Sequence, residues 1–491
     1  MDPVLSLTAR QSLMWIEDQL HPGRPLNNMV TLLAVQRPID VGAFQRAFAR
    51  LVERHDAMRM TVRHLGERFA AQFHPMGDAR GGVGLAFLDL SREAEPKRAY
   101  DDWLQARCGK VFQFGEPLYE ATLIKLGDAQ FVFFMNQHHC VTDGRTCQLL
   151  IDDLDRYYRE EAHGLEASEQ TASEEAERPS FCDHLTARQS YRNSEAAAES
   201  EAYWNERFAT APELISFYGQ STDLKRLSTL RHDLRLPVEL AERIVAGKRT
   251  VPPSILFIAV LFAFLRRISG NGDICVGIPQ LNRPKEHADT MVLFMDISLN
   301  RLQLDEDDSF ASLLKKLRAE TKSVKPHRGH PVVSRNARYE ALLNFRLPAE
   351  TRFDGAPAKL RRLSPLALLD EIPSDAEPSE EWAGRDGLAL DVTHDPVVKS
   401  FDLAFDFNEG AWPCAEGRER AIRALSRAAG CLARYHEVRR RLRAARSLLS
   451  RTKVPGDRRR GPARQCAHGR TGAGPACRRG GRQRRHRHAN Q

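Results

Sequence analysis

Apolar residues recur at helical spacing in two segments near the start of the chain. Residues 41–52 place Phe44 and Leu51 on one helix face, and residues 8–20 open with a Thr-x-x-Gln pattern that is typical of a capped helix start. Four further segments are short, rich in β-branched or aromatic residues and bounded by Gly, Asp or Pro, which predicts strands over 58–62, 85–88, 119–126 and 130–136. The first part of the chain is therefore expected to mix helices and strands.

The second half of the chain has the same mixed character. Helical spacing predicts helices over 188–208, 238–246 and 254–267. Runs of β-branched and aromatic residues predict strands over 274–278, 292–297, 341–346, 388–393 and 400–407. The pattern as a whole indicates an α/β protein of the α+β type.

Composition divides the 491 residues into parts. Between Glu160 and Pro179 the sequence turns to Glu, Ala, Ser and Thr without apolar periodicity, which is typical of a solvated linker. The Pro-rich and acidic stretch 363–386 is expected to form a surface loop. We therefore predict an N-terminal lobe over 1–165, a linker over 166–180, a C-terminal lobe over 181–436 and a tail over 437–491.

The tail accounts for the positive charge of the chain. The sequence has 73 Lys or Arg and 65 Asp or Glu. The residues after Val438 contain 18 of these basic residues and only one of the acidic residues. The rest of the chain therefore has nine more acidic than basic residues. The tail also lacks apolar periodicity, so we expect it to be disordered. It would be a basic arm for nucleic acid or an acidic partner, a linker, or a GC-rich coding stretch translated out of frame, and we favour the last.

No membrane or secretion signal is expected. The longest apolar run, Ile255 to Leu265, is shorter than the roughly 20 residues that a bilayer-spanning helix needs. The first twenty residues mix acidic and apolar residues, unlike a secretory signal. Nine cysteines without a Cys-x-x-Cys pair favour reduced thiols over disulfides or a zinc site. We expect a cytoplasmic protein without a bound metal.

The clearest chemical signal is the run His138-His139-Cys-Val-Thr-Asp143-Gly144. A predicted strand leads into it and residues 145–161 after it have helical spacing, so the run forms a loop between a strand end and a helix start. Adjacent strand residues point to opposite faces, so one histidine is expected to enter a cleft and a paired-histidine metal site is disfavoured. Taken singly, these residues could be a helix cap, a turn glycine and structural histidines; taken together, they indicate an active-site loop.

This run resembles the HHxxxDG signature of the condensation domains of nonribosomal peptide synthetases, which is shared with the wider chloramphenicol-acetyltransferase-like acyltransferases. Other stretches are similar to condensation-domain motifs and occur in the same order: Leu7-Thr8-Ala9-Arg10-Gln11 with Trp15, Arg54-His55-Asp56 with Arg59, Tyr203-Trp204, and Val276-Gly277-Ile278-Pro279 leading to Arg283. The resemblance covers about residues 5–435. It implies two acetyltransferase-like lobes arranged as a V-shaped pseudodimer, with the HHxxxDG loop in a tunnel between them.

The resemblance also implies chemistry and partners. In this family two carrier proteins present thioesters on phosphopantetheine arms, and an amine on the acceptor attacks the donor carbonyl to form an amide. We therefore expect peptidyl or acyl carrier proteins and other synthetase modules as partners. No cofactor is expected to be bound by this chain, and neither a membrane nor nucleic acid is expected as a partner.

The roles of the site residues follow in part from the chemistry and in part from the resemblance. His139 is expected to be the base, or the hydrogen-bond acceptor that positions the amine, and His138 to support the loop. Asp143 is expected to order the turn in an ion pair with Arg283, its partner in the family pattern. Gly144 is expected to allow a close backbone approach and to offer an N–H to the substrate.

Neighbouring polar residues receive no role. Cys140 lies inside the loop, but the resemblance implies direct attack of the amine on the thioester, so covalent catalysis by this cysteine is not expected. His330, His394 and Asp395 occur in the second half, where polar groups are more often structural, and are assigned no chemistry.

Two other functions stay open. The first is a free-standing acyltransferase that makes an ester, because His139 would deprotonate an alcohol as readily as an amine. The second is a noncatalytic docking module of the same fold, against which the intact histidine pair counts.

Overall fold

The computed structural model describes residues 4–427, apart from 67, 79, 81, 166–177, 218–228, 247–250, 333–335, 348–349, 364–386, 396–399, 409 and 413. Residues 1–438 form one compact unit. Most of the predicted linker, nearly all of the predicted acidic loop and the whole predicted basic tail lie outside the described residues.

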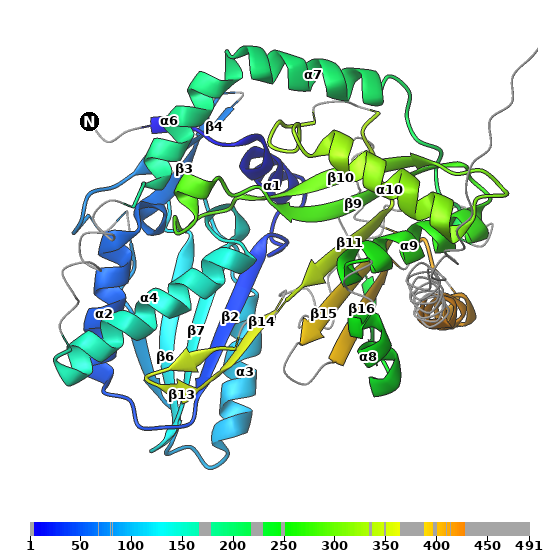
Figure 1. Ribbon diagram of the computed structural model, residues 1–491. Helices are drawn as coiled ribbons and strands as arrows, with labels where there is room; N and C mark the ends of the chain where they lie inside the picture. The colour runs from blue at the N-terminus through cyan, green and yellow to red at the C-terminus, as the bar shows by residue number, and fades with distance from the viewer. Residues whose placement is uncertain are drawn as a thin grey trace, which may run out of the picture. The chain divides into compact units, whose positions relative to one another are not determined.

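The first lobe is built on a five-stranded sheet in the order β14-β2-β7-β6-β5 (Figure 1). Its strands are β2 (Asn28–Val35), β5 (Ala86–Asp89), β6 (Tyr119–Gly127), β7 (Gln130–His138) and β14 (Lys359–Leu363). Neighbouring strands are antiparallel, except that β5 runs parallel to β6. Strands β5, β6 and β7 lie close to their predicted bounds, whereas β2 and β14 were not predicted.

Helices cover both faces of this sheet. α2 (Val41–Arg54) and α4 (Gly144–His163) pack on one face, and α3 (Pro96–Cys108) on the other. Side chains alternate along β7, so Phe133 packs with α2 and α4 while Phe134 packs with α3. Burial on both faces explains why β7 is continuously apolar.

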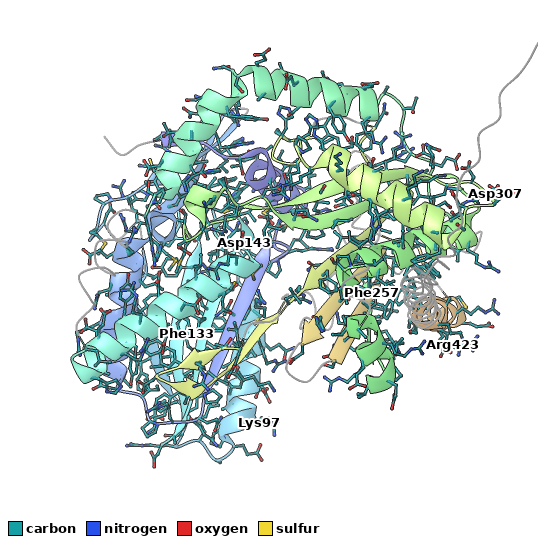
Figure 2. The ribbon with its side chains drawn as sticks, viewed as in Figure 1. Lys97, Phe133, Asp143, Phe257, Asp307 and Arg423 are labelled. Carbon is teal, nitrogen blue, oxygen red and sulfur yellow. The ribbon has the colours of Figure 1, made fainter. Side chains whose placement is uncertain are left out.

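The second lobe is built on a six-stranded sheet in the order β10-β9-β11-β15-β16-β8. Its strands are β8 (Thr229–Arg235), β9 (Asp273–Leu281), β10 (Met295–Gln303), β11 (Ala341–Arg346), β15 (Leu388–Asp395) and β16 (Ser400–Asn408). α8 (Val238–Ala246), α9 (Pro253–Ser269) and α10 (Phe310–Val324) share its core. Phe257 of α9 marks this core in Figure 2, and Phe133 marks the core of the first lobe.

A segment of the second half belongs to the first lobe. Strand β14 pairs with β2, and the hairpin of β12 (Arg352–Phe353) and β13 (Ala356–Pro357) precedes it. Asp354 (φ 49°) and Gly355 (φ 76°) form the turn of this hairpin, where glycine adopts a positive φ without strain. The ring of Phe353 lies 5.6 Å from that of Phe44 and 5.2 Å from that of Tyr158. The predicted span of the C-terminal lobe did not anticipate this exchange.

The remaining elements include a three-stranded sheet in the order β1-β4-β3. They are β1 (Val4–Ser6), α1 (Ala9–Leu20), the 3-10 turn η1 (Asp56–Arg59), β3 (Met60–Leu65), β4 (Arg68–Phe73), α6 (Phe181–Arg192), α7 (Glu195–Arg207) and η4 (Lys285–His287). The single helix predicted over 188–208 is wrong: it is two helices, because Asn193 ends α6 and Ser194 caps α7 by accepting the N–H of Ala197 at 3.2 Å. No helix within the described part of the chain combines the length and apolarity needed to span a bilayer.

Candidate active site

The histidine loop joins β7 to α4 through the 3-10 turn η2 (His139–Val141). The N–H of His139 donates to the carbonyl of Asn27 on the neighbouring chain segment at 2.6 Å. The side chain of Gln11 on α1 donates to the carbonyl of Cys140 at 2.7 Å and also accepts the N–H of Thr8. The Thr-x-x-Gln pattern predicted a helix start, but not that the same glutamine holds the loop.

His138 is fixed by contacts on every side and is 2% exposed. Its Nε2 lies 2.7 Å from the Asp18 carboxylate, and its Nδ1 accepts the N–H of Cys140 at 3.1 Å. The ring stacks on Trp15 with 4.5 Å between centroids. Because Nδ1 is an acceptor, the ring carries its proton on Nε2 and has no nitrogen left for a substrate. This geometry agrees with the supporting role expected of His138; Asp18 was not predicted.

His139 is placed differently, because its ring is only half-buried. Nδ1 is buried and makes no hydrogen bond with the described residues, and Nε2 likewise makes none with them. Burial lowers the pKa of His139 and the positive charge of Arg10 lowers it further, while polar backbone atoms of His139 and Thr142 and the charge of Asp143 raise it only in part. The ring is therefore neutral near pH 7 and can accept a proton.

This lowered pKa predicts the pH dependence of the reaction. A base must be deprotonated to act, and the folded protein keeps His139 deprotonated down to a pH below its ordinary pKa of 6.5. We expect the single-turnover rate to be nearly constant from about pH 8 to pH 7 and to fall to half of this plateau only below pH 6.5. A rate that already declines between pH 8 and pH 7 would contradict the lowered pKa.

Asp143 is completely buried and caps α4. One carboxylate oxygen accepts the N–H groups of Arg145 and Thr146 at 3.0 and 2.8 Å. The other oxygen accepts the N–H groups of Phe294 and Met295 at 2.9 and 3.3 Å. Both oxygens are thus occupied by backbone donors, and the carboxylate is not available to a substrate. Figure 2 labels Asp143 at the start of α4.

The predicted ion pair between Asp143 and Arg283 is present at 3.3 Å, between side chains that are 0% and 8% exposed. The guanidinium of Arg283 also donates to Thr146 Oγ1 at 3.0 Å and lies 4.5 Å from the centre of the Phe294 ring. The pair therefore ties the loop after β9 to the first turn of α4. The strand predicted over 292–297 is wrong at its start, because residues 292–294 pair with α4 through Asp143 and Thr146 and β10 begins only at Met295.

Gly144 is the first residue of α4 and is exposed. Its N–H makes no hydrogen bond with the described residues, as is usual at a helix start, so it is free for a substrate oxygen. Its carbonyl accepts Nη1 of Arg362 from β14 at 2.8 Å. A Cβ at this position would lie 2.9 Å from that nitrogen, so the close approach expected at Gly144 is the approach of Arg362.

The side chain of Cys140 is sealed from solvent. Its side chain is 0% exposed and packs in the apolar cluster that contains Trp15 and Val141. We expect Cys140→Ala to keep at least about half of the wild-type turnover, because a sealed thiol cannot attack a thioester. Steady-state assays and intact-protein mass spectrometry would check this, and an acyl adduct that forms on the wild type but is missing from the variant would contradict it.

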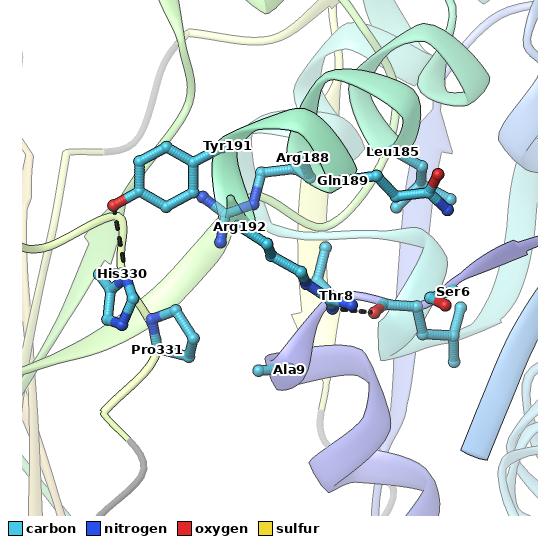
Figure 3. A pocket seen from close by; sticks show the side chains of 11 residues that line it. Ser6, Thr8, Ala9, Leu185, Arg188, Gln189, Tyr191, Arg192, His330 and Pro331 are labelled. Carbon is cyan, nitrogen blue, oxygen red and sulfur yellow. Dashed lines mark hydrogen bonds between the residues drawn. The ribbon is translucent and has the colours of Figure 1, made fainter. Parts of the chain in front are cut away.

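The three residues without a predicted role, His330, His394 and Asp395, have local structural contacts. His330 borders a pocket of about 70 Å³ between the start of α1 and α6, where its ring lies 3.4 Å from the Tyr191 hydroxyl (Figure 3). His394 stacks on Phe401 at 4.3 Å, and Asp395 pairs with Ser400 in the strand register. Across the described ranges no three His, Cys, Asp or Glu side chains are grouped as metal ligands would be.

Comparison with known proteins supports the same family as the motif. Residues 1–334 match the family model described as Condensation domain. One of the proteins that make up the linear gramicidin synthase of Brevibacillus parabrevis is 28% identical over 422 residues, which cover 83% of this chain and 5% of that protein. Phosphinothricin tripeptide synthetase PhsC of Streptomyces viridochromogenes is 26% identical over 426 residues, which cover 82% of this chain and 36% of that protein. The chain thus spans a small part of these relatives.

Solved structures match the fold over most of the chain. One match is a double mutant of the starter condensation domain of rhizomide synthetase RzmA, solved in complex with C8-CoA and Leu-SNAC. It has a TM-score of 0.70 and 20% sequence identity, and the match covers 88% of this chain and 94% of the RzmA chain. The first condensation domain of the calcium-dependent antibiotic synthetase has a TM-score of 0.68 at 20% identity and covers 87% and 97%. The predicted fold class, a pseudodimer of chloramphenicol-acetyltransferase-like lobes, is confirmed.

Proposed function

The chain belongs to the condensation-domain family of nonribosomal peptide synthetases, and from this premise we propose that it joins a carrier-bound acyl or peptidyl thioester to a carrier-bound amine. In this reaction the amine nitrogen attacks the thioester carbonyl, a C–N bond forms, the C–S bond breaks and the donor arm leaves as a thiol. The nitrogen must lose a proton, which ends on the departing sulfur. Phosphopantetheine arms on partner carrier proteins would bring both substrates.

One observation carries this proposal: His139 is the polar group of the loop that is left free. Its Nε2 has no partner among the described residues, while the ring nitrogens of His138 and both oxygens of Asp143 are occupied. A neutral imidazole can take the proton of the attacking amine and return it to the sulfur. The free N–H of Gly144, at the positive end of α4, is suitably charged to stabilise the oxygen of the tetrahedral intermediate.

Holding both tethered reactants together would supply a further part of the rate. Two substrates confined beside one imidazole react as if they were a single molecule, and this can lower a barrier by several kcal/mol. The RzmA domain, which was solved with C8-CoA and Leu-SNAC, supports acyl and aminoacyl substrates for this fold.

The proposal is tested with the full chain and loaded carriers. Donor carriers with acyl groups and acceptor carriers with aminoacyl groups are mixed with the protein, and the mass of the intact acceptor carrier is followed. Transfer of the acyl group in an amide supports the proposal, and transfer to a hydroxyl acceptor in an ester supports the acyltransferase alternative. Binding of the carriers without transfer from any donor would leave the docking module and overturn the proposal.

A further inference from the structure

An unpaired arginine lies beside the candidate base within the described residues. Arg10 is the second residue of α1, next to Gln11, whose side chain holds the carbonyl of Cys140 at 2.7 Å. The guanidinium is close enough to His139 to lower the pKa of that ring. Arg10 therefore belongs to the histidine loop in space, although 128 residues separate it from His139 in the sequence.

Arg10 lacks the partners that an enclosed cation normally has. It is partly buried, its Nε is fully buried without a hydrogen bond, and the guanidinium makes neither a hydrogen bond nor an ion pair with the described residues. Other arginines near α1 are satisfied: Arg188 donates to the Gly329 carbonyl at 2.9 Å and Arg192 to the Leu7 carbonyl at 3.3 Å. An enclosed donor left unpaired is costly, which points to a ligand that supplies the acceptor.

Asp296, at the start of β10, does not neutralise this arginine. The two described side chains interact electrostatically but form no ion pair with each other, and one oxygen of Asp296 accepts the N–H of Ile297 at 2.8 Å. Burial raises the pKa of Asp296 although Arg10 and Arg188 lower it. Among the described side chains, Arg10 thus has no ion-pair partner, although its charge acts on both His139 and Asp296.

Three kinds of anion could meet this charge. The phosphate of a phosphopantetheine arm is separated from the thioester by the whole length of the arm, so it cannot lie beside His139 while the thioester reacts. The oxyanion of the intermediate exists only briefly, and the free N–H of Gly144 is available for it. A carboxylate on the substrate is a standing charge, and its geometry matches the fork of a guanidinium.

We propose that Arg10 binds a carboxylate on the group that is brought to His139, so that this enzyme prefers an acidic substrate. The inference rests on the proposed function and names its substrate class. An acidic aminoacyl acceptor fits best, since it carries an amine for His139 and a carboxylate for Arg10 on one small skeleton. A dicarboxylic acyl donor would present the same carboxylate from the other substrate.

The test measures binding and needs no turnover, so its failure differs from a failure of amide formation. Calorimetric titrations compare the aspartyl and asparaginyl amides of aminopantetheine, which mimic the acceptor, and the succinyl and succinamoyl amides, which mimic the donor. Each pair differs only by a carboxylate in place of a carboxamide. We expect the acidic member of one pair to bind about tenfold or more tightly to the wild type, because hydrogen bonds to charged groups are the strong ones.

Two variants assign this preference to Arg10. Arg10→Ala is expected to weaken the binding of the acidic probe alone, so that the two probes of the pair bind with about equal affinity. Arg10→Lys is expected to keep part of the preference for the acidic probe. Arg63→Ala is the matched control, because Arg63 is exposed on β3, and it should leave the ratio unchanged. A preference for the acidic member of the aspartyl pair shows that Arg10 binds the acceptor substrate. A preference for the acidic member of the succinyl pair shows that it binds the donor substrate. Equal binding within both pairs, or a preference that survives in Arg10→Ala, overturns the inference.

Discussion

His139→Ala is expected to slow amide formation by about 10²- to 10⁴-fold. The half-buried ring is the group of the loop with a nitrogen that the described residues leave free, and alanine cannot accept the amine proton in its place. Part of the catalysis should survive, because the carriers still hold the two reactants together. Single-turnover mixing of loaded carriers, followed by intact-protein mass spectrometry, measures the loss.

A matched variant separates chemistry from structure. His64→Ala removes the same ring from an exposed position on β3 and should leave the rate unchanged. Both variants should unfold at about the wild-type denaturant concentration, because the His139 ring makes no hydrogen bond to the described residues that would hold the loop. A folded His139→Ala protein with more than half of the wild-type rate would show that this imidazole is not the base.

Asp143→Ala is expected to destabilise the fold by about 3–5 kcal/mol, since it leaves the charge of Arg283 buried without its partner. The same change removes the cap of α4 and the acceptor for the N–H of Phe294. Activity should fall with the folded fraction, because the loop that carries His139 leads directly into this cap. Denaturation in urea, monitored by circular dichroism, measures the free energy of unfolding.

A simpler cap in the same protein provides the control. Asp40 caps α2 by accepting the N–H of Ala43 at 2.8 Å, but it is exposed and forms no ion pair with the described residues. Asp40→Ala should therefore cost only about 1 kcal/mol. An Asp143→Ala protein that is as stable as Asp40→Ala and still inactive would mean that Asp143 acts in the chemistry and not in the structure.

Local patterns in the sequence predict the elements that build the loop. The apolar run of β7, the 3.6-residue spacing of α4 and the Thr-x-x-Gln start of α1 are signals within a few residues, and the structure has all three elements close to those positions. The contact between Asp143 and Arg283 joins residues 140 positions apart. It could be predicted only through the family pattern, because spacing carries no information at that distance.

The parts that were not predicted depend on long-range contacts. Strand β14 is short, and it is a strand because it pairs with β2, more than 300 residues earlier in the sequence. Residues 292–294 are apolar like a strand, but α4 binds their backbone instead of a sheet neighbour. Asp18 and Arg10 look like ordinary charges on an amphipathic helix, and only the fold brings them to His138 and His139.

The central claim, that the ring of His139 takes the proton of the attacking amine, is tested most directly by the single-turnover rate of amide formation as a function of pH in the wild type and in His139→Ala. The account predicts that the wild-type rate falls below pH 6.5 and that this fall is missing from the variant. The slower rate of the variant no longer depends on the protonation state of an imidazole. The same acidic fall in both proteins would place the titrating group elsewhere and contradict the account.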